Sequence, residues 1–185
     1  IFIAFFYLFF IFTREAQTKK APGWAIPLAL FLFTLALRLP YFFPPWVGHW
    51  DESIFILMGR EAFEGNLPYV NLLDQKQPLT YYLFALFFTL FGKSIAAARI
   101  GGAFFIFFTS WFVYGIGKKL ANKTAGFWSA VLLIVYATIV DKTGVMTLTE
   151  ILAILPMTAL LFFLLFGEKS MRNIFYMGLA AGCAF

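Results

Sequence analysis

Residues 95–117 read IAAARIGGAFFIFFTSWFVYGIG, an apolar stretch whose single charge, Arg99, stands near its start. A helix of about 20 apolar residues is long enough to cross the hydrocarbon core of a bilayer. The stretches 24–43, 124–140 and 148–167 have a similar length and character. The sequence therefore predicts four membrane-spanning helices and an all-α fold, a polytopic transmembrane helix bundle.

The composition excludes a chain that folds mainly in water. Hydrophobic residues make up 62% and charged residues 12% of the chain, whereas soluble domains carry about 25% charged residues. The net charge of +5 is spread along the chain rather than gathered on one soluble face, so we expect no nucleic-acid partner. The single cysteine, Cys183, allows no disulfide framework within this chain.

The basic residues indicate which loops face the cytoplasm, because cytoplasmic loops are enriched in lysine and arginine. Three short segments, 13–23, 118–123 and 168–173, hold eight of the 14 basic residues, namely Arg14, Lys19, Lys20, Lys118, Lys119, Lys123, Lys169 and Arg172. The four helices then alternate in direction, and loop 44–93 lies on the non-cytoplasmic side. We expect a multi-pass integral protein of the plasma (inner) membrane with this loop facing outside.

Apolar runs stand at both ends of the chain, at residues 1–12 and 174–185. Neither run shows a complete helix, so we expect the chain to be a fragment of a longer protein. Residues 1–23 are predicted to contain part of an extra transmembrane helix and a cytoplasmic linker. Residues 24–185 are predicted to be the amino-terminal part of a transmembrane domain, and the role of residues 1–12 stays open.

The external loop 44–93 is predicted to contain two short helices lying at the membrane surface. In the first, 51–64, Ile54, Phe55 and Met58 fall on one side, as in an amphipathic helix. The second, 79–91, begins after Pro78, which suits a first helical turn. At about 1.5 Å per residue this helix is about 20 Å long, so it is too short to span the bilayer. We expect it to be interfacial or re-entrant.

The acidic segment His49-Trp50-Asp51-Glu52 is the first candidate for chemistry. Carboxylates beside apolar and aromatic neighbours gain proton affinity, which suits a general base at neutral pH, so Asp51 and Glu52 are predicted to be catalytic. A structural interpretation stays open, because Asp51 is also a favourable helix N-cap and Glu52 a favourable first-turn residue. His49 is either an acceptor-site or metal-site residue or a hydrogen-bonded bystander.

Other charged residues complete the candidate site. Lys76 is predicted to bind an anionic lipid headgroup or a phosphate, and Arg99 a substrate phosphate. As alternatives, their charged ends extend to the interface, or Arg99 and Arg38 pair with Asp51 or Glu52. Glu150 begins an apolar helix and must face protein, water or a cation. Asp51, Glu52 and Glu150 together are candidates to hold a divalent cation such as Mg²⁺ or Mn²⁺; no other cofactor is expected.

Six short motifs stand in an order that resembles a known family: 38–39, 51–52, 65–69, 74–78, 90–92 and 97–100. The series is similar to the amino-terminal third of the GT-C membrane glycosyltransferases, in particular the dolichyl-phosphate-mannose protein mannosyltransferase-like group and its aminoarabinose-transferase relatives. It differs from the latter at Ser53-Ile54-Phe55, where they carry an Arg-Tyr pair, and at Gln77, where they carry a proline.

The resemblance implies a GT-C-like helical fold and sugar transfer from a polyprenyl-phosphate donor to a lipid, protein or glycan acceptor on the outer face. It implies that Asp51 acts on the acceptor, that Lys76 contacts the donor phosphate, and that Glu150 is a further acidic site residue. Membrane lipids would be the surrounding partners. The alternative is a transporter or flippase, which places ionisable groups near the bilayer midplane, where the predicted helices are uncharged. A third interpretation is a non-enzymatic membrane scaffold.

Overall fold

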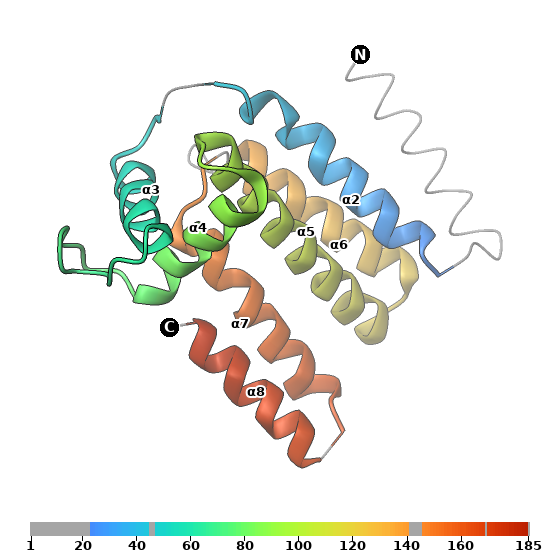
Figure 1. Ribbon diagram of the computed structural model, residues 1–185. Coiled ribbons are helices and arrows are strands. Elements are labelled where there is room, and N and C mark those ends of the chain that lie inside the picture. Colours follow the sequence, from blue (N-terminus) through green and yellow to red (C-terminus); the bar gives the residue numbers. More distant parts are fainter. Residues whose placement is uncertain (1–22, 45–46, 141–145, 169, 185) are drawn as a thin grey trace.

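The computed structural model describes residues 23–44, 47–140, 146–168 and 170–184 (Figure 1). Over these residues the chain is helical, as predicted. The helices are α2 (Ala25–Arg38), the 3-10 turn η1 (Leu39–Tyr41), α3 (Trp50–Phe63), α4 (Pro78–Phe91), α5 (Ile95–Leu120), α6 (Lys123–Val135), the π-helical turn η2 (Tyr136–Val140), α7 (Thr149–Phe166) and α8 (Met171–Ala184). Residues 1–22, predicted to hold a partial extra helix, lie outside the described ranges.

Two helices, α5 and α7, are each long and apolar enough to cross a membrane. Helix α5 starts where the sequence predicted, because the Ser94 hydroxyl caps it by accepting the Ala97 amide at 3.1 Å. Helix α7 has Leu148 and Gly167 as its flanking cap residues, which were the predicted ends of the fourth spanning helix. Two of the four predicted spans therefore have the expected length.

The other two predicted spans form shorter apolar helices, Ala25–Tyr41 and Lys123–Ile139. They nevertheless belong to the same bundle, because Leu30 and Phe33 of α2, Ile106 of α5 and Phe127 and Ile134 of α6 form one buried core. Helices α5 and α6 approach each other closely at Gly117 and Gly126, where a side chain on either glycine would overlap the opposite backbone. Their complete crossing of the bilayer stays a prediction.

The helices alternate in direction, as the charge pattern predicted. Figure 1 shows the start of α2, the α5–α6 turn and the α7–α8 turn towards one end of the bundle, and α3 and α4 towards the other. Lys118 and Lys119 close α5 and Lys123 opens α6, so these charges gather at the end away from α3 and α4. Which end faces the cytoplasm is still inferred from the sequence alone.

Helices α3 and α4 form the predicted pair of short helices in the loop 44–93. Phe55 and Met58 of α3 are buried against Tyr81, Phe84 and Phe88 of α4 in a second core cluster. Helix α4 has 14 residues, about 21 Å at the usual rise, and Pro78 occupies its first turn. The amphipathic face of α3 and the shortness of α4 are therefore confirmed.

Candidate active site

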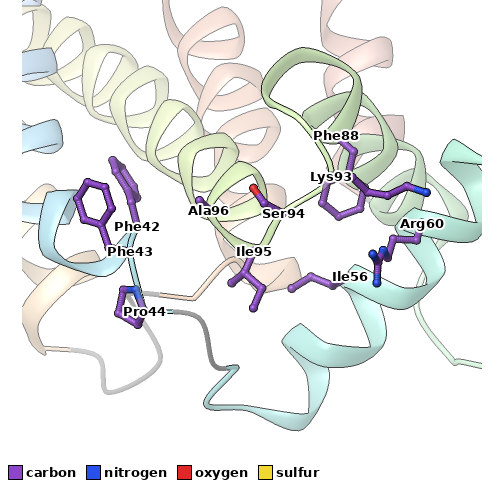
Figure 2. A pocket seen from close by; sticks show the side chains of 10 residues that line it. All are labelled: Phe42, Phe43, Pro44, Ile56, Arg60, Phe88, Lys93, Ser94, Ile95 and Ala96. Atoms are coloured by element: carbon purple, nitrogen blue, oxygen red, sulfur yellow. The ribbon is translucent and has the colours of Figure 1, made fainter.

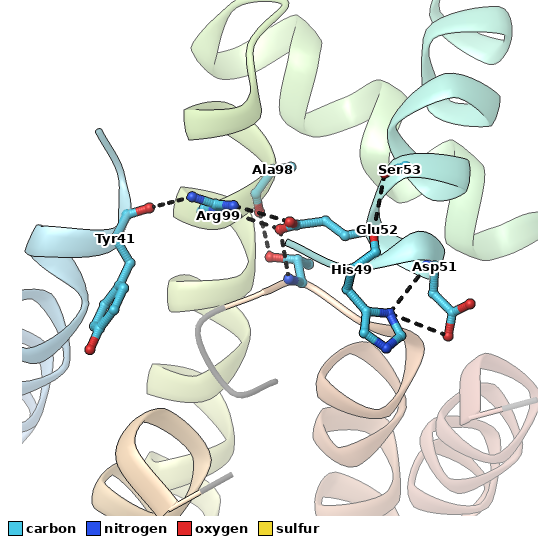
Figure 3. Close-up of polar contacts among 8 residues, drawn as sticks. Tyr41, His49, Asp51, Glu52, Ser53, Ala98 and Arg99 are labelled. Carbon is cyan, nitrogen blue, oxygen red and sulfur yellow. Dashed lines mark hydrogen bonds and ion pairs between the residues drawn. The ribbon is translucent and has the colours of Figure 1, made fainter. Parts of the chain in front are cut away.

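The Glu52 carboxylate and the Arg99 guanidinium form an ion pair inside the protein (Figure 3). Arg99 Nη2 donates to Glu52 Oε2 at 3.1 Å and Arg99 Nε donates to Glu52 Oε1 at 3.3 Å. Glu52 is 0% and Arg99 3% exposed. Bidentate ion pairs between arginine and a carboxylate are among the stronger hydrogen-bonded pairs in proteins. This pair therefore fixes the start of α3 against α5.

Neighbouring polar groups complete the surroundings of this pair. Arg99 Nη1 donates to the Tyr41 carbonyl at 2.9 Å, and the Thr147 amide donates to Glu52 Oε1 at 3.3 Å. The Thr147 hydroxyl donates to the Ala98 carbonyl at 2.9 Å. Gly102 leaves room for this contact, because a side chain at that position would overlap Thr147. Buried charges are tolerated only when their hydrogen-bonding capacity is met, and these contacts connect α3, α5, η1 and the segment before α7.

Arg38, the last residue of α2, is also 0% exposed. It lies within electrostatic range of both Glu52 and Arg99. Of the interpretations open for Arg99, the structure shows the pairing with Glu52. Sequence reasoning missed the depth of this burial, although Glu52, Phe55 and Gly59 follow the spacing of one helix face and all three are buried.

His49, rather than Asp51, is the N-cap of α3. Its Nδ1 atom accepts the Asp51 amide at 3.2 Å, and its carbonyl accepts the Ser53 hydroxyl at 3.2 Å. The interpretation of Asp51 as the cap is therefore wrong, because the helix starts at Trp50, two residues earlier than a cap at Asp51 requires. The Asp51 side chain is 44% exposed and lies 3.8 Å from His49 Nδ1. Its carboxylate is accessible in the first turn.

Lys76 lies in a short loop that two tyrosines hold in place. The buried Tyr81 donates its hydroxyl to Asp74 Oδ2 at 2.8 Å, and the Tyr69 hydroxyl donates to the Lys76 carbonyl. Burial and the Asp74 carboxylate raise the pKa of Tyr81, so its hydroxyl stays protonated and remains a donor. The half-buried Lys76 side chain makes no hydrogen bond or ion pair with the described residues, which leaves its ammonium available.

The structure places Asp51 and Lys76 at the same end of the α3–α4 pair, without direct contact between them. The two helices run parallel, because Phe55 contacts Phe84 in their first halves and Glu64 pairs with Lys93 just beyond their ends. The start of α3 therefore lies beside the start of α4, which Lys76 precedes. Segment 147–152 touches both helix starts, through the Thr147 bond to Glu52 and a small cavity shared with Gln77 and Thr80.

Glu150 is exposed in the first turn of α7, where its carboxylate accepts the Thr149 hydroxyl at 3.3 Å. It lines a cavity of about 150 Å³ together with Thr109, Tyr136 and Ile154. Within the described residues, no group of three or more acidic, histidine or cysteine side chains is placed to hold a metal ion. Asp51, Glu52 and Glu150 therefore do not form such a group among the described residues, and a divalent cation stays a prediction.

The fold and this polar end together define a helical membrane protein with a cluster of charged residues at one end of its bundle. A sequence model of the family described as dolichyl-phosphate-mannose-protein mannosyltransferase matches residues 75–185, more than half of the chain, and the chain belongs to this family. The match agrees with the predicted resemblance and does not favour the transporter alternative. No curated protein and no solved structure matches the chain. The matched range includes Lys76, Arg99 and Glu150 and begins after Asp51 and Glu52.

Proposed function

We propose that this chain forms the amino-terminal part of a glycosyltransferase that transfers a sugar from a polyprenyl-phosphate donor to a lipid, protein or glycan acceptor. The family match over residues 75–185 is the observation that carries the proposal. The proposed location is the outer face of the plasma (inner) membrane in a multi-pass protein, which the distribution of lysine and arginine supports.

In the proposed reaction, Asp51 is the general base and Lys76 binds the donor phosphate. The acceptor hydroxyl gives its proton to the Asp51 carboxylate while its oxygen forms a bond to the anomeric carbon. The bond from that carbon to the phosphate oxygen breaks, and polyprenyl phosphate leaves with the electron pair. A carboxylate on the acceptor side and a cation on the leaving phosphate are the groups that this displacement needs. The exposure of Asp51 and the available ammonium of Lys76 support these roles.

We propose positioning roles for Glu52 and Arg99, in place of the direct substrate contacts that the sequence suggested. Both side chains are buried against each other, and Glu52 follows Asp51 directly in α3. Their pairing would hold the first turn of α3, and so the Asp51 carboxylate, in one orientation. Glu150 is proposed to contribute to the acceptor side from the first turn of α7.

The substitution Asp51→Asn tests the base directly. Because His49 is the cap, the amide should leave α3 intact while removing the proton acceptor, which typically contributes about 10² to 10⁴ in rate. The full-length protein would be reconstituted with labelled polyprenyl-phosphate mannose and membrane extract as acceptor, and label would be followed into lipid, protein and glycan fractions. Glu168→Gln, which removes an exposed carboxylate beyond the end of α7, is the matched control. Transfer by Asp51→Asn at the control rate would reject the role of Asp51.

A further inference from the structure

A cavity of about 380 Å³ lies between α3, the first residues of α5 and residues 42–44 (Figure 2). Phe42, Phe43, Ile56 and Phe88 form much of its apolar wall, and the first residues of α5 close it. Its volume lies within the usual range for sites that bind small organic molecules. Arg60 and Lys93 contribute the charged side chains of the lining, so the cavity combines apolar walls with positive charge.

The position of Arg60 on α3 separates this cavity from the candidate active site. Asp51 and Arg60 are nine residues apart, which is about 2.5 helical turns, so their side chains leave opposite sides of the helix. The rise over nine residues is about 13.5 Å. A phosphate held by Arg60 would therefore lie on the side of α3 opposite to the Asp51 carboxylate.

Arg60 is the cation available to a ligand in the cavity. Lys93 already donates to the Glu64 carboxylate at 2.5 Å and lies over the Phe63 ring at 5.1 Å. The exposed Arg60 side chain lies within electrostatic range of Glu64 but makes no hydrogen bond or ion pair with the described residues. In Figure 2 its guanidinium lies beside Ile56, next to the apolar wall. Arginine suits phosphate groups because its planar guanidinium presents several donors at once.

We propose that the cavity binds an anionic glycerophospholipid of the surrounding bilayer, with an acyl chain against Phe42, Phe43 and Ile56 and the phosphate on Arg60. The sugar carrier is the less suitable occupant. The proposed function requires the carrier phosphate beside Lys76 and Asp51, whereas Arg60 lies on the opposite side of α3. A bilayer phospholipid also presents its phosphate at the interfacial depth where the short helices α3 and α4 are expected to lie.

A photoactivatable phosphatidylglycerol with a diazirine on one acyl chain tests this site. The full-length protein is reconstituted in phosphatidylcholine nanodiscs with this probe, and crosslinked peptides are identified by mass spectrometry. Labelling of the peptides that contain Phe42–Pro44, Ile56 or Ile95 should fall about fivefold in Arg60→Gln, the usual effect of one interfacial cation on an anionic lipid. Arg172→Gln, which removes an exposed cation from the first turn of α8, should leave labelling unchanged. Ala96→Leu, which narrows the cavity without changing its charge, should lower labelling as well.

Competition identifies the occupant. Unlabelled phosphatidylglycerol should suppress the labelling at these peptides, and additional phosphatidylcholine should not. Equal labelling of Arg60→Gln and the wild type, or equal competition by both phospholipids, would overturn the site. Stronger competition by polyprenyl phosphate than by phosphatidylglycerol would overturn the phospholipid assignment. The outcome is independent of the transfer assay with Asp51→Asn, because the readout is lipid labelling in the absence of donor.

Discussion

The amide of Thr147 donates a hydrogen bond to the carboxylate of Glu52, which lies 95 positions earlier in the chain, at 3.3 Å. The same carboxylate pairs with Arg99. Through Glu52 the start of α3, the first turns of α5 and the segment before α7 are therefore joined at one buried point. Glu52 follows Asp51 directly in the chain, and Thr147 lies three residues before Glu150. A structural role for Glu52 follows directly from these contacts.

We predict that Glu52→Gln destabilises the folded protein by about 3–5 kcal/mol, because it leaves the Arg99 charge buried without its partner. Arg99→Gln should cost a similar amount, and the double variant should cost much less than the sum of the two. Thermal unfolding of the four proteins in the same detergent gives this comparison. If Glu52→Gln keeps its stability and loses transfer alone, Glu52 acts on substrate rather than as a positioning residue.

The N-cap assignment predicts different results for two substitutions of His49. His49→Ala should destabilise α3 by about 1 kcal/mol, and His49→Asn should restore most of this, because an asparagine oxygen can accept the amide that His49 Nδ1 accepts now. Sugar transfer should follow stability in both variants. Loss of transfer in a stable His49→Asn protein would instead assign the imidazole a chemical role at the acceptor site.

The tyrosine network predicts that Tyr81→Phe weakens donor binding without touching the donor. The ring stays in the core, but the Asp74 carboxylate and the Lys76 loop lose a hydrogen bond, and one such bond corresponds to roughly a 2- to 10-fold effect. We expect a rise of this size in the apparent KM for the polyprenyl-phosphate sugar, with little change in kcat.

Two comparisons make this prediction specific. Lys76→Ala should raise the same KM further, and adding Tyr81→Phe to it should have no additional effect. Tyr82→Phe removes a hydroxyl from the neighbouring, exposed ring and serves as the control. An unchanged KM in Lys76→Ala would show that this ammonium does not bind the donor.

The Glu64–Lys93 pair predicts a pH-dependent contribution to stability. The hydrogen bond and charge of Lys93 lower the pKa of Glu64 from its ordinary value of 4.5. Because the folded pKa is the lower one, the contribution is complete above pH 4.5 and is lost as the pH falls through the lowered pKa. We expect Glu64→Gln to lower the unfolding midpoint slightly at neutral pH, and less in high salt, because both side chains are partly exposed.

Well below pH 4.5, the wild type and Glu64→Gln should unfold at the same temperature. Lys93→Gln should lower the midpoint at neutral pH at least as much, because it also removes the contact with the Phe63 ring, and adding Glu64→Gln to it should have no further effect. A difference between wild type and Glu64→Gln that persists at acid pH would mean that the substitution acts through packing rather than through the ion pair.

The sequence by itself determined the helices of this protein. Long apolar runs need helical hydrogen bonding wherever lipid replaces water, and Ser94, Pro78 and Gly92 mark helix ends through local geometry. The shortness of α4 and the apolar face of α3 followed from residue count and periodicity. The motif order was also sufficient to indicate the glycosyltransferase family, which the match over residues 75–185 supports.

Only the tertiary structure decided what the polar residues of the candidate site do. Asp51 and Glu52 are neighbours of the same charge type, yet α3 turns Glu52 into the core, where it meets Arg99, and leaves Asp51 accessible. The identity of the cap depended on the backbone at His49. Asp51 and Lys76 lie at the same end of the α3–α4 pair because of how α3 packs on α4. The physical reason is that a side chain's burial and partners are set by helices distant in sequence, whereas helix formation itself is local.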